Sequence, residues 1–231
     1  MTDSITIAGE DGTFNAYVAR PASTPAPAVI VIQEIYGVNV VMRGVADRLA
    51  EAGFLAVAPD LFWRIEPGID LSDHDEEGNK RAFELFGLYD VDTGIHDIAA
   101  TIDQVRDLAD CTGKVGAVGY CLGGKLAFLT ATRTDSDATV GYYPVGLDSL
   151  VGEAEKLAHP LMLHVAEEDR FVPKTSQAAV EQALKNHPQV QLFAYPGRDH
   201  AFARKGGEHY DAADAAKANE RTLALFKKAL G

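Results

Sequence analysis

The sequence predicts an α/β protein with a mostly parallel central sheet and helices on both faces. Short, continuous apolar runs such as residues 28–32 are typical of strands that are buried on both faces. Helical patterns follow most of these runs, so strands and helices alternate along the chain. Right-handed crossovers between such units place helices on both faces of the sheet. With 231 residues and 47% hydrophobic content, we expect one domain over residues 1–231.

The elements follow in a regular order. Alternating apolar and polar residues on either side of Gly9-Glu-Asp-Gly12 predict a hairpin over residues 5–20, and residues 21–27 are then a surface connection. Further strands are expected at 28–32, 54–58, 115–118, 139–143, 161–165 and 190–195. Helices are expected at 41–51, 80–88, 91–108, 122–132, 174–185 and 212–230. The acidic stretch 61–79, rich in Pro, Gly and Asp, is either a binding loop or a solvated linker.

Charge and composition exclude several classes of partner. The formal net charge is −13 and no basic run is present, which argues against binding to nucleic acid or to an acidic membrane surface. The first residues do not resemble a signal peptide, and no apolar run approaches the length of a membrane span. We therefore expect a cytoplasmic protein, either a monomer or a weak oligomer. Cys111 and Cys121 are expected to be free thiols, and nothing in the sequence indicates a metal or an organic cofactor.

Residues 114–125 predict a strand that turns sharply into a helix at Cys121. Gly119 and Gly123 flank the cysteine two residues away on either side, where a strained turn leaves no room for a Cβ. This Gly-x-Cys-x-Gly pattern is typical of a nucleophile elbow. In that geometry the helix N-terminus stabilises a thiolate, and the backbone N–H of Leu122 donates to an oxyanion. The alternative is a buried cysteine in a Gly-rich turn.

Two further reactive side chains follow the carboxyl ends of predicted strands. Asp169 comes after the strand 161–165, and His200 comes after the strand 190–195. The chain order of nucleophile, acid and histidine is the order of the α/β-hydrolase triad. Glu167 and Glu168 adjoin Asp169, but the turn after Asp169 favours the aspartate. The alternative for His200 is an exposed loop histidine.

Together, several segments resemble the dienelactone hydrolases (carboxymethylenebutenolidases) over nearly the whole chain. They are Gln33-Glu-Ile-Tyr-Gly37, Asp60-Leu-Phe62, Gly119-Tyr-Cys-Leu-Gly-Gly124, Gly141-Tyr-Tyr143, Asp169-Arg-Phe-Val-Pro173 and His200-Ala-Phe-Ala-Arg204. The resemblance implies an α/β-hydrolase fold and a cysteine-histidine-aspartate enzyme. Such an enzyme opens an enol-lactone ring in bacteria that degrade aromatic compounds through catechol intermediates.

The resemblance also implies roles for single residues. Cys121 is then the nucleophile, His200 the base that later activates water, and Asp169 the carboxylate that orients the histidine. Glu34 would interact with the resting thiol and help to take its proton when substrate arrives, although on local sequence alone it could equally be a loop glutamate facing water. The two oxyanion N–H groups would come from Ile35 and Leu122.

On the substrate side, Arg204 matches the family arginine that holds a substrate carboxylate, and its alternative is a solvated loop arginine. The further substrate-binding candidates are Arg81, Tyr143, Phe83 and Phe202. The sequence departs from the family at Asn79, where a second arginine is expected, although a small shift in register would bring Lys80 or Arg81 there. Phe83 and Phe86 stand in place of a tyrosine and a tryptophan, which predicts a more apolar pocket.

These departures leave the substrate open. The first hypothesis is hydrolysis of a carboxylated enol-lactone, and the alternative is a carboxylesterase or lactonase of the same fold with a more apolar substrate. Two readings lie outside hydrolysis: a redox-sensing thiol and a non-catalytic protein that binds a small ligand. Cys111 is poorly placed to resolve an oxidised Cys121, and a non-catalytic relative need not keep all three triad residues.

Overall fold

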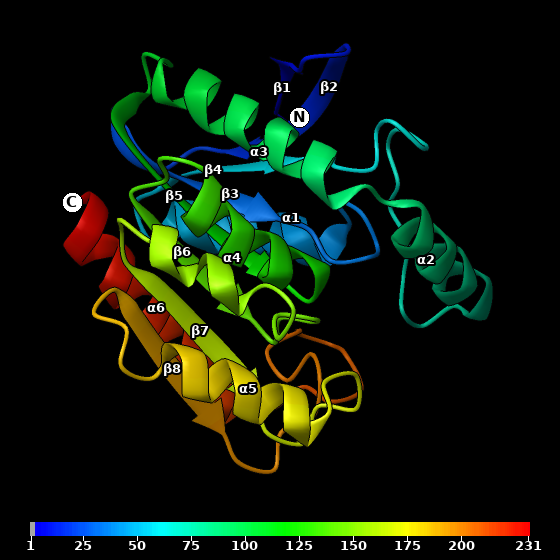
Figure 1. Ribbon diagram of the computed structural model, residues 1–231. Coiled ribbons are helices and arrows are strands. Elements are labelled where there is room, and N and C mark those ends of the chain that lie inside the picture. Colours follow the sequence, from blue (N-terminus) through cyan, green and yellow to red (C-terminus); the bar gives the residue numbers. More distant parts are fainter. Residues whose placement is uncertain (1–2) are drawn as a thin grey trace. The chain divides into compact units, whose positions relative to one another are not determined.

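The computed structural model describes residues 3–231 and has an eight-stranded sheet in the order β1-β2-β4-β3-β5-β6-β7-β8 (Figure 1). The strands are β1 (Ser4–Ala8), β2 (Thr13–Ala19), β3 (Ala26–Ile32), β4 (Leu55–Pro59), β5 (Cys111–Tyr120), β6 (Ala138–Tyr142), β7 (Leu161–Ala166) and β8 (Val190–Tyr195). The helices are α1 (Val40–Glu51), α2 (Glu76–Leu88), α3 (Val91–Arg106), α4 (Leu122–Arg133), the 3₁₀ helix η1 (Val151–Lys156), α5 (Lys174–Leu184) and α6 (Ala212–Leu230). Pairs β3–β4, β6–β7 and β7–β8 are parallel, which confirms a mostly parallel sheet.

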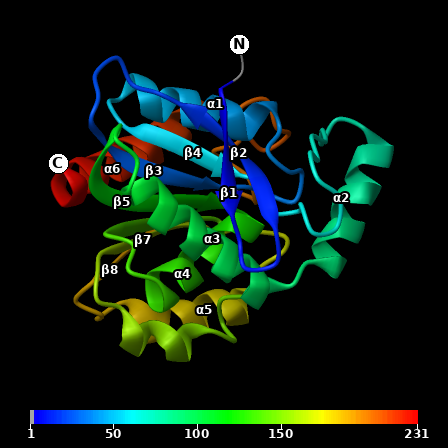
Figure 2. The ribbon, with the colours of Figure 1, turned by 90° about the horizontal axis from the view of Figure 1, so that it is seen from above.

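By contacts the chain divides into two compact units, one up to Ala117 together with Leu230 and one formed by residues 118–229 and 231. In the first unit, β1 and β2 form the predicted antiparallel hairpin, and β2 continues antiparallel onto β4. Helices α1 and α3 both contact β3 and β4, and they lie on opposite sides of these strands (Figure 2). Residues 28–32 of β3 are completely buried, as the continuous apolar run predicts.

In the second unit, α5 and α6 lie on opposite faces of β7 and β8 (Figure 1). Side chains alternate between the two faces of a strand, so His164 of β7 reaches α6 while Val165 faces the side of α5. This arrangement brings the loops after β6, β7 and β8 to one end of three neighbouring parallel strands. Reactive side chains on these loops are therefore placed close together.

A buried polar network attaches α6 to the sheet. His164 contacts the Tyr195 hydroxyl through Nδ1 at 2.8 Å and Thr222 Oγ1 through Nε2 at 3.1 Å. Burial, with a smaller contribution from the Arg221 charge, lowers the pKa of His164 to about 3, so the ring is neutral. Arg221 donates to the Tyr195 oxygen at 3.1 Å, which leaves the Tyr195 proton for His164 Nδ1. The Thr222 hydroxyl continues the network to Tyr142 at 2.7 Å, so every member has a partner.

Most predicted elements are confirmed to within one or two residues, and three predictions need correction. The strand expected at 115–118 is longer and runs over Cys111–Tyr120, because its first four residues alternate between half-buried and exposed and so do not continue the apolar run. The helix expected at residue 80 begins at Glu76, because Asp75 caps it by accepting the N–H of Gly78 at 2.9 Å. The surface connection ends earlier than expected, since β3 already begins at Ala26. The pattern also gave no sign of η1.

Candidate active site

Cys121 lies at the turn between β5 and α4, where the Gly-x-Cys-x-Gly pattern places it. Its backbone has φ 58° and ψ −114°, a conformation with a cost on the order of 1–3 kcal/mol for a residue with a Cβ. The surrounding turn is closely packed, because a Cβ on Gly119 would collide with the carbonyl oxygen of Gly123. A Cβ on Gly124 would come within 2.5 Å of the carbonyl oxygen of Tyr142. The predicted strained turn is confirmed, and close packing explains Gly119 and Gly124.

Hydrogen bonds hold Cys121 between the sheet and the helix. Its N–H donates to the carbonyl oxygen of Tyr142, at the end of β6, at 3.1 Å. Its own carbonyl oxygen accepts the N–H groups of Gly124 at 2.9 Å and Lys125 at 3.2 Å, which starts the first turn of α4. The strained backbone is thus fixed on both sides.

The thiol of Cys121 is protonated at neutral pH. Burial of the sulfur raises its pKa to about 12; the N–H of Leu122 donates to the sulfur and opposes the shift, and the negative charge of Asp169 adds to it. The expectation that the helix N-terminus yields a stabilised thiolate is therefore wrong for the resting protein, because desolvation outweighs the local N–H. Cys121 needs a base to become a nucleophile.

Asp169 and His200 form a buried pair on the loops after β7 and β8. The Oδ2 atom of Asp169 lies 2.8 Å from Nδ1 of His200, and both residues are less than a tenth exposed. The other carboxylate oxygen of Asp169 accepts the N–H of Phe171 at 2.9 Å. Of the three acidic residues considered from sequence, Asp169 meets the histidine, whereas Glu168 pairs with Lys174 at 2.9 Å.

The contact with Asp169 determines how the His200 ring is used. An ionised carboxylate accepts a proton held on Nδ1, so Nε2 of a neutral ring carries the lone pair. Nε2 is buried and has no hydrogen-bond partner among the described residues. A buried ring nitrogen without a partner costs free energy in the resting protein, and it is ready to accept a proton.

Two aromatic rings pack edge-on against His200, and a third, Phe202, packs behind one of them. The ring of Phe171 has its centroid 4.9 Å from that of His200. The ring of Tyr143 lies edge-on to His200, with centroids 5.1 Å apart, and edge-on to Phe202 at 5.7 Å. Tyr143 has a positive φ of 35°, and its hydroxyl is buried without a partner among the described residues. Burial raises the pKa of Tyr143 well above its usual range, so this hydroxyl stays a neutral donor. Phe202 is fully buried and supports the ring of Tyr143.

Arg204 is a buried cation in the loop that follows β8, in the second unit. Its side chain is almost completely buried, and this burial lowers its pKa to about 10, so the guanidinium remains charged at neutral pH. A desolvated guanidinium interacts strongly with a carboxylate. Of the two alternatives drawn from sequence, the burial excludes a solvated loop arginine.

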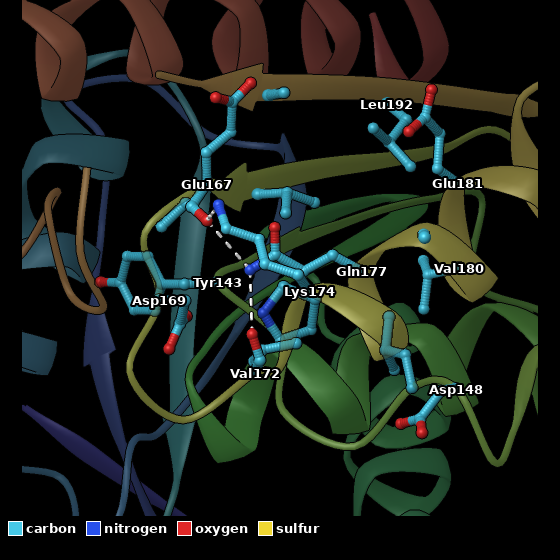
Figure 3. A pocket seen from close by; sticks show the side chains of 16 residues that line it. Tyr143, Asp148, Glu167, Asp169, Val172, Lys174, Gln177, Val180, Glu181 and Leu192 are labelled. Atoms are coloured by element: carbon cyan, nitrogen blue, oxygen red, sulfur yellow. Dashed lines mark hydrogen bonds between the residues drawn. The ribbon is translucent and has the colours of Figure 1, made fainter. Parts of the chain in front are cut away.

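The loop that carries Asp169 is braced from α5, beside a pocket of about 450 Å³ that Tyr143 and Asp169 help to line (Figure 3). Gln177 donates to the carbonyl oxygens of Glu167 at 3.1 Å and Val172 at 2.9 Å. Lys174 donates to the same Glu167 carbonyl. Neither contact was predictable from the sequence, because polar residues in the first turns of an exposed helix carry no signal of such a contact.

The Glu34 loop belongs to the first unit. Glu34 is 2% exposed and pairs with Gly37 in an isolated β-bridge, so the alternative of a glutamate facing water is wrong. Ile35 is also buried. The side chain of Gln33 accepts the N–H of Leu61 at 3.0 Å, which ties this loop to the end of β4. The catalytic role of Glu34 and the oxyanion role of Ile35 stay predictions.

The candidate cations of the first unit have other partners. Arg81 pairs with Glu66 at 2.6 Å and with Glu84 at 3.1 Å. The side chain of Asn79 accepts a hydrogen bond from the Tyr36 hydroxyl at 2.7 Å and donates one to the carbonyl oxygen of Asp73 at 2.8 Å. These two bonds connect the loop after β3 to the start of α2. Lys80 is exposed. The substrate-binding role of Arg81 stays a prediction.

The aromatic residues of α2 are open to solvent within the part of the chain described here. Phe83 is 52% exposed and Phe86 is 40% exposed. The more apolar pocket expected from these two residues, and their contact with substrate, stay predictions.

Searches for other kinds of site found no candidates in residues 3–231. No group of three or more His, Cys, Asp or Glu side chains there is arranged to hold a metal ion. No helix in that range is long and apolar enough to cross a membrane. Cys111 and Cys121 are not joined in a disulfide, so both are thiols, as predicted.

Comparison with known proteins places the chain among lactone hydrolases. A model of the dienelactone hydrolase family matches residues 14–230. A provisionally named carboxymethylenebutenolidase of Azospirillum brasilense is 49% identical, with 100% of both chains covered. The carboxymethylenebutenolidase of Pseudomonas putida is 41% identical over 96% of this chain and 95% of its own. A crystal structure of a provisionally named dienelactone hydrolase from Klebsiella pneumoniae superimposes with a TM-score of 0.87 and 27% identity, covering 99% of this chain and 98% of the other.

Proposed function

Because the chain belongs to the dienelactone hydrolase family, we propose that it opens enol-lactones such as dienelactone with Cys121 as the nucleophile. Its fold is the α/β-hydrolase fold, and it is a hydrolase of small carboxylic esters or lactones. The observation that carries the proposal is the Asp169–His200 pair at 2.8 Å, which leaves the buried Nε2 atom of His200 without a hydrogen-bond partner in residues 3–231. The nucleophile elbow lies in the same unit.

The first step is transfer of the acyl group to sulfur. Since the pKa of Cys121 is about 12, a base must remove the thiol proton as the sulfur attacks the lactone carbonyl carbon. We assign this base to Glu34, with His200 as the other acceptor in the active site. The negative oxygen of the tetrahedral intermediate accepts N–H groups of Leu122 and Ile35. The bond between the carbonyl carbon and the ring oxygen then breaks, and the ring oxygen leaves as an enolate that takes back the proton held by the base.

The second step releases the acid. A water molecule gives a proton to Nε2 of His200 and attacks the thioester carbonyl, and Asp169 stabilises the imidazolium that forms. The carbon–sulfur bond breaks, the sulfur recovers a proton from the histidine, and a carboxylic acid product leaves. Both steps together consume one water molecule and leave the enzyme unchanged.

The substrate in this proposal carries a carboxylate that Arg204 binds. The net charge of −13 cannot attract an anion over a long range, so the anion must be recognised by short contacts. The buried guanidinium of Arg204 suits this task. We further propose that the enzyme serves the degradation of aromatic compounds, where such lactones arise from ring cleavage.

A second candidate is an esterase or lactonase with a more apolar substrate. It is favoured by α2, where Asn79 and Arg81 are engaged with residues of the protein and Phe83 is half exposed. A redox-sensing thiol is disfavoured, because such thiols need a low pKa and burial raises that of Cys121.

The test is turnover of a panel of carboxylated lactones and neutral aryl esters by the wild type, Cys121→Ala and the matched control Cys111→Ala. We expect Cys121→Ala to abolish turnover with an unchanged circular dichroism spectrum, and Cys111→Ala to behave as the wild type. Mass spectrometry of the quenched reaction should find the acyl group on Cys121. Full activity of Cys121→Ala would refute the nucleophile, and a wild-type preference for the neutral esters would favour the second candidate.

A further inference from the structure

The carboxylate of Asp199 bridges the two loops that carry the acid and the histidine. Its Oδ1 atom accepts the backbone N–H of His200 at 2.6 Å and the backbone N–H of Arg170 at 2.9 Å. Its Oδ2 atom accepts Nε of the Arg170 side chain at 3.0 Å. We call this set of contacts, from the Asp199 carboxylate to the two N–H groups and the Arg170 guanidinium, the Asp199 clamp.

The clamp is ionised at physiological pH. Desolvation by burial acts to raise the pKa of Asp199, but the hydrogen bonds from Arg170 and His200 outweigh it and lower the pKa to about 2. Hydrogen bonds to a charged acceptor are roughly twice as strong as neutral ones. Two other titratable side chains lie nearby: Nε2 of His209 is 3.8 Å from Oδ2, and the carboxylate of Glu208 is 3.9 Å from the Arg170 guanidinium.

The Asp199 clamp joins the residues next to Asp169 and His200 in the chain, so it affects the distance between these two side chains. Arg170 directly follows Asp169, and Asp199 directly precedes His200. The Oδ1 atom of Asp199 therefore fixes the distance between the backbone at Arg170 and the backbone at His200. The side chains of Asp169 and His200, which these backbone segments carry, meet at 2.8 Å. The loops are also joined by Glu168 N–H to the carbonyl oxygen of Arg198 at 2.8 Å, which extends the ladder of β7 and β8.

Between β8 and α6, His200 lies in a long loop without helix or strand. Ala201 has a positive φ of 63°, and residues 197–210 form turns with no helix or strand. A loop of this kind depends on side-chain contacts for its conformation. The Asp199 clamp is the contact that acts directly on the backbone of His200.

We propose that Asp199 is a positioning residue, which holds His200 against Asp169 by gripping the N–H groups of Arg170 and His200. It touches neither substrate nor the reacting atoms, and its effect on rate rests on the proposed function. The sequence contains a weak sign of it, an acidic residue beside the expected histidine, but the distant partner Arg170 is visible only in the structure.

The experiment compares Asp199→Ala, Asp199→Asn and Arg170→Ala with the matched control Asp214→Ala. The control removes an ion pair of similar exposure from Arg198 of the same loop, at 2.6 Å, without touching either gripped N–H group. For Asp199→Ala we expect kcat to fall about 10- to 100-fold with little change in KM, since misplacement of a catalytic group by about 1 Å costs that much. Asp199→Asn keeps one acceptor oxygen and should recover part of the loss. Arg170→Ala keeps both N–H groups and should lose less than Asp199→Ala, and Asp214→Ala should keep the wild-type kcat.

A second readout separates this inference from the proposed function. The proton between His200 Nδ1 and Asp169 should give a downfield proton resonance in the wild type, and this resonance should weaken or broaden by exchange with solvent in Asp199→Ala. If Asp199→Ala does not fold, kcat and the downfield resonance are both measured on Asp199→Asn. A folded variant with wild-type kcat and an unchanged resonance would overturn the clamp while leaving the hydrolase intact. If the wild type hydrolysed none of the panel, the proposed function would fail, and the resonance alone would decide the clamp.

Discussion

The raised pKa of Cys121 predicts slow alkylation of the resting thiol. With a pKa of about 12, about one thiol in 100,000 is ionised at pH 7, against about one in 30 for a cysteine of ordinary pKa, about 8.5. The more basic thiolate is intrinsically more nucleophilic, and a Brønsted slope of about 0.4–0.5 recovers roughly 25- to 55-fold. Iodoacetamide should therefore modify Cys121 about a hundredfold more slowly at pH 7 than it modifies a free cysteine.

The alkylation rate of Cys121 should also keep rising with pH, without a plateau at the ordinary cysteine pKa. Because the thiol pKa is raised, ionisation should increase about tenfold for each pH unit up to the edge of protein stability, with no plateau near the ordinary cysteine pKa. The assay is quantitative peptide mass spectrometry after timed alkylation, which measures Cys111 in the same sample as an internal reference. A Cys121 rate equal to that of free cysteine at pH 7, with a plateau below about pH 9, would refute the argument from burial and indicate a resting thiolate.

Three other variants test the geometry and the proposed roles. Gly119→Ala should destabilise the fold by about 1–3 kcal/mol or more in urea unfolding, because its Cβ would collide with the Gly123 carbonyl; a change below about 0.5 kcal/mol would contradict the packing described. Glu34→Gln should slow single-turnover acylation while leaving hydrolysis of a preformed acyl-enzyme unaffected, and an unchanged acylation rate would leave Glu34 a structural residue. Arg204→Ala should lower kcat/KM for carboxylated lactones about tenfold to over a hundredfold, the loss of about 1.5–3 kcal/mol from a charged hydrogen bond. Neutral aryl esters should be little affected, and an equal loss for both classes would mean that Arg204 supports its loop instead of binding substrate.

Local sequence patterns predicted the fold because several of them, read in chain order, indicate the same alternation of strands and helices. Residues 28–32 are apolar without interruption, and only a strand covered on both faces buries all of them. The spacing of Gly119 and Gly123 around Cys121 predicts a backbone too crowded for a Cβ, and the collision at Gly119 confirms this for the first of the two. The start of α2 was misplaced because its N-cap, Asp75, is hidden among several other acidic residues of an irregular stretch.

The choice of candidate site residues was also largely available from sequence. Parallel strands end at one edge of a sheet, so residues just past β7 and β8 were expected to meet, and Asp169 contacts His200 as that rule requires. The motifs that resemble the dienelactone hydrolases pointed to the family that comparison then showed. The roles of the single residues remain predictions for the experiments above.

By itself, then, the sequence determined the order of the elements, the strained turn at Cys121 and the pairing of Asp169 with His200, since periodicity and strand ends are local properties of the chain. Only the tertiary structure decided the electrostatics and the supports of the site. The pKa of Cys121 depends on how completely neighbouring segments exclude water from its sulfur, and no local pattern records that burial. The grip of Asp199 on Arg170 likewise joins residues 29 positions apart, and such a contact exists only once the folded strands bring their loops together.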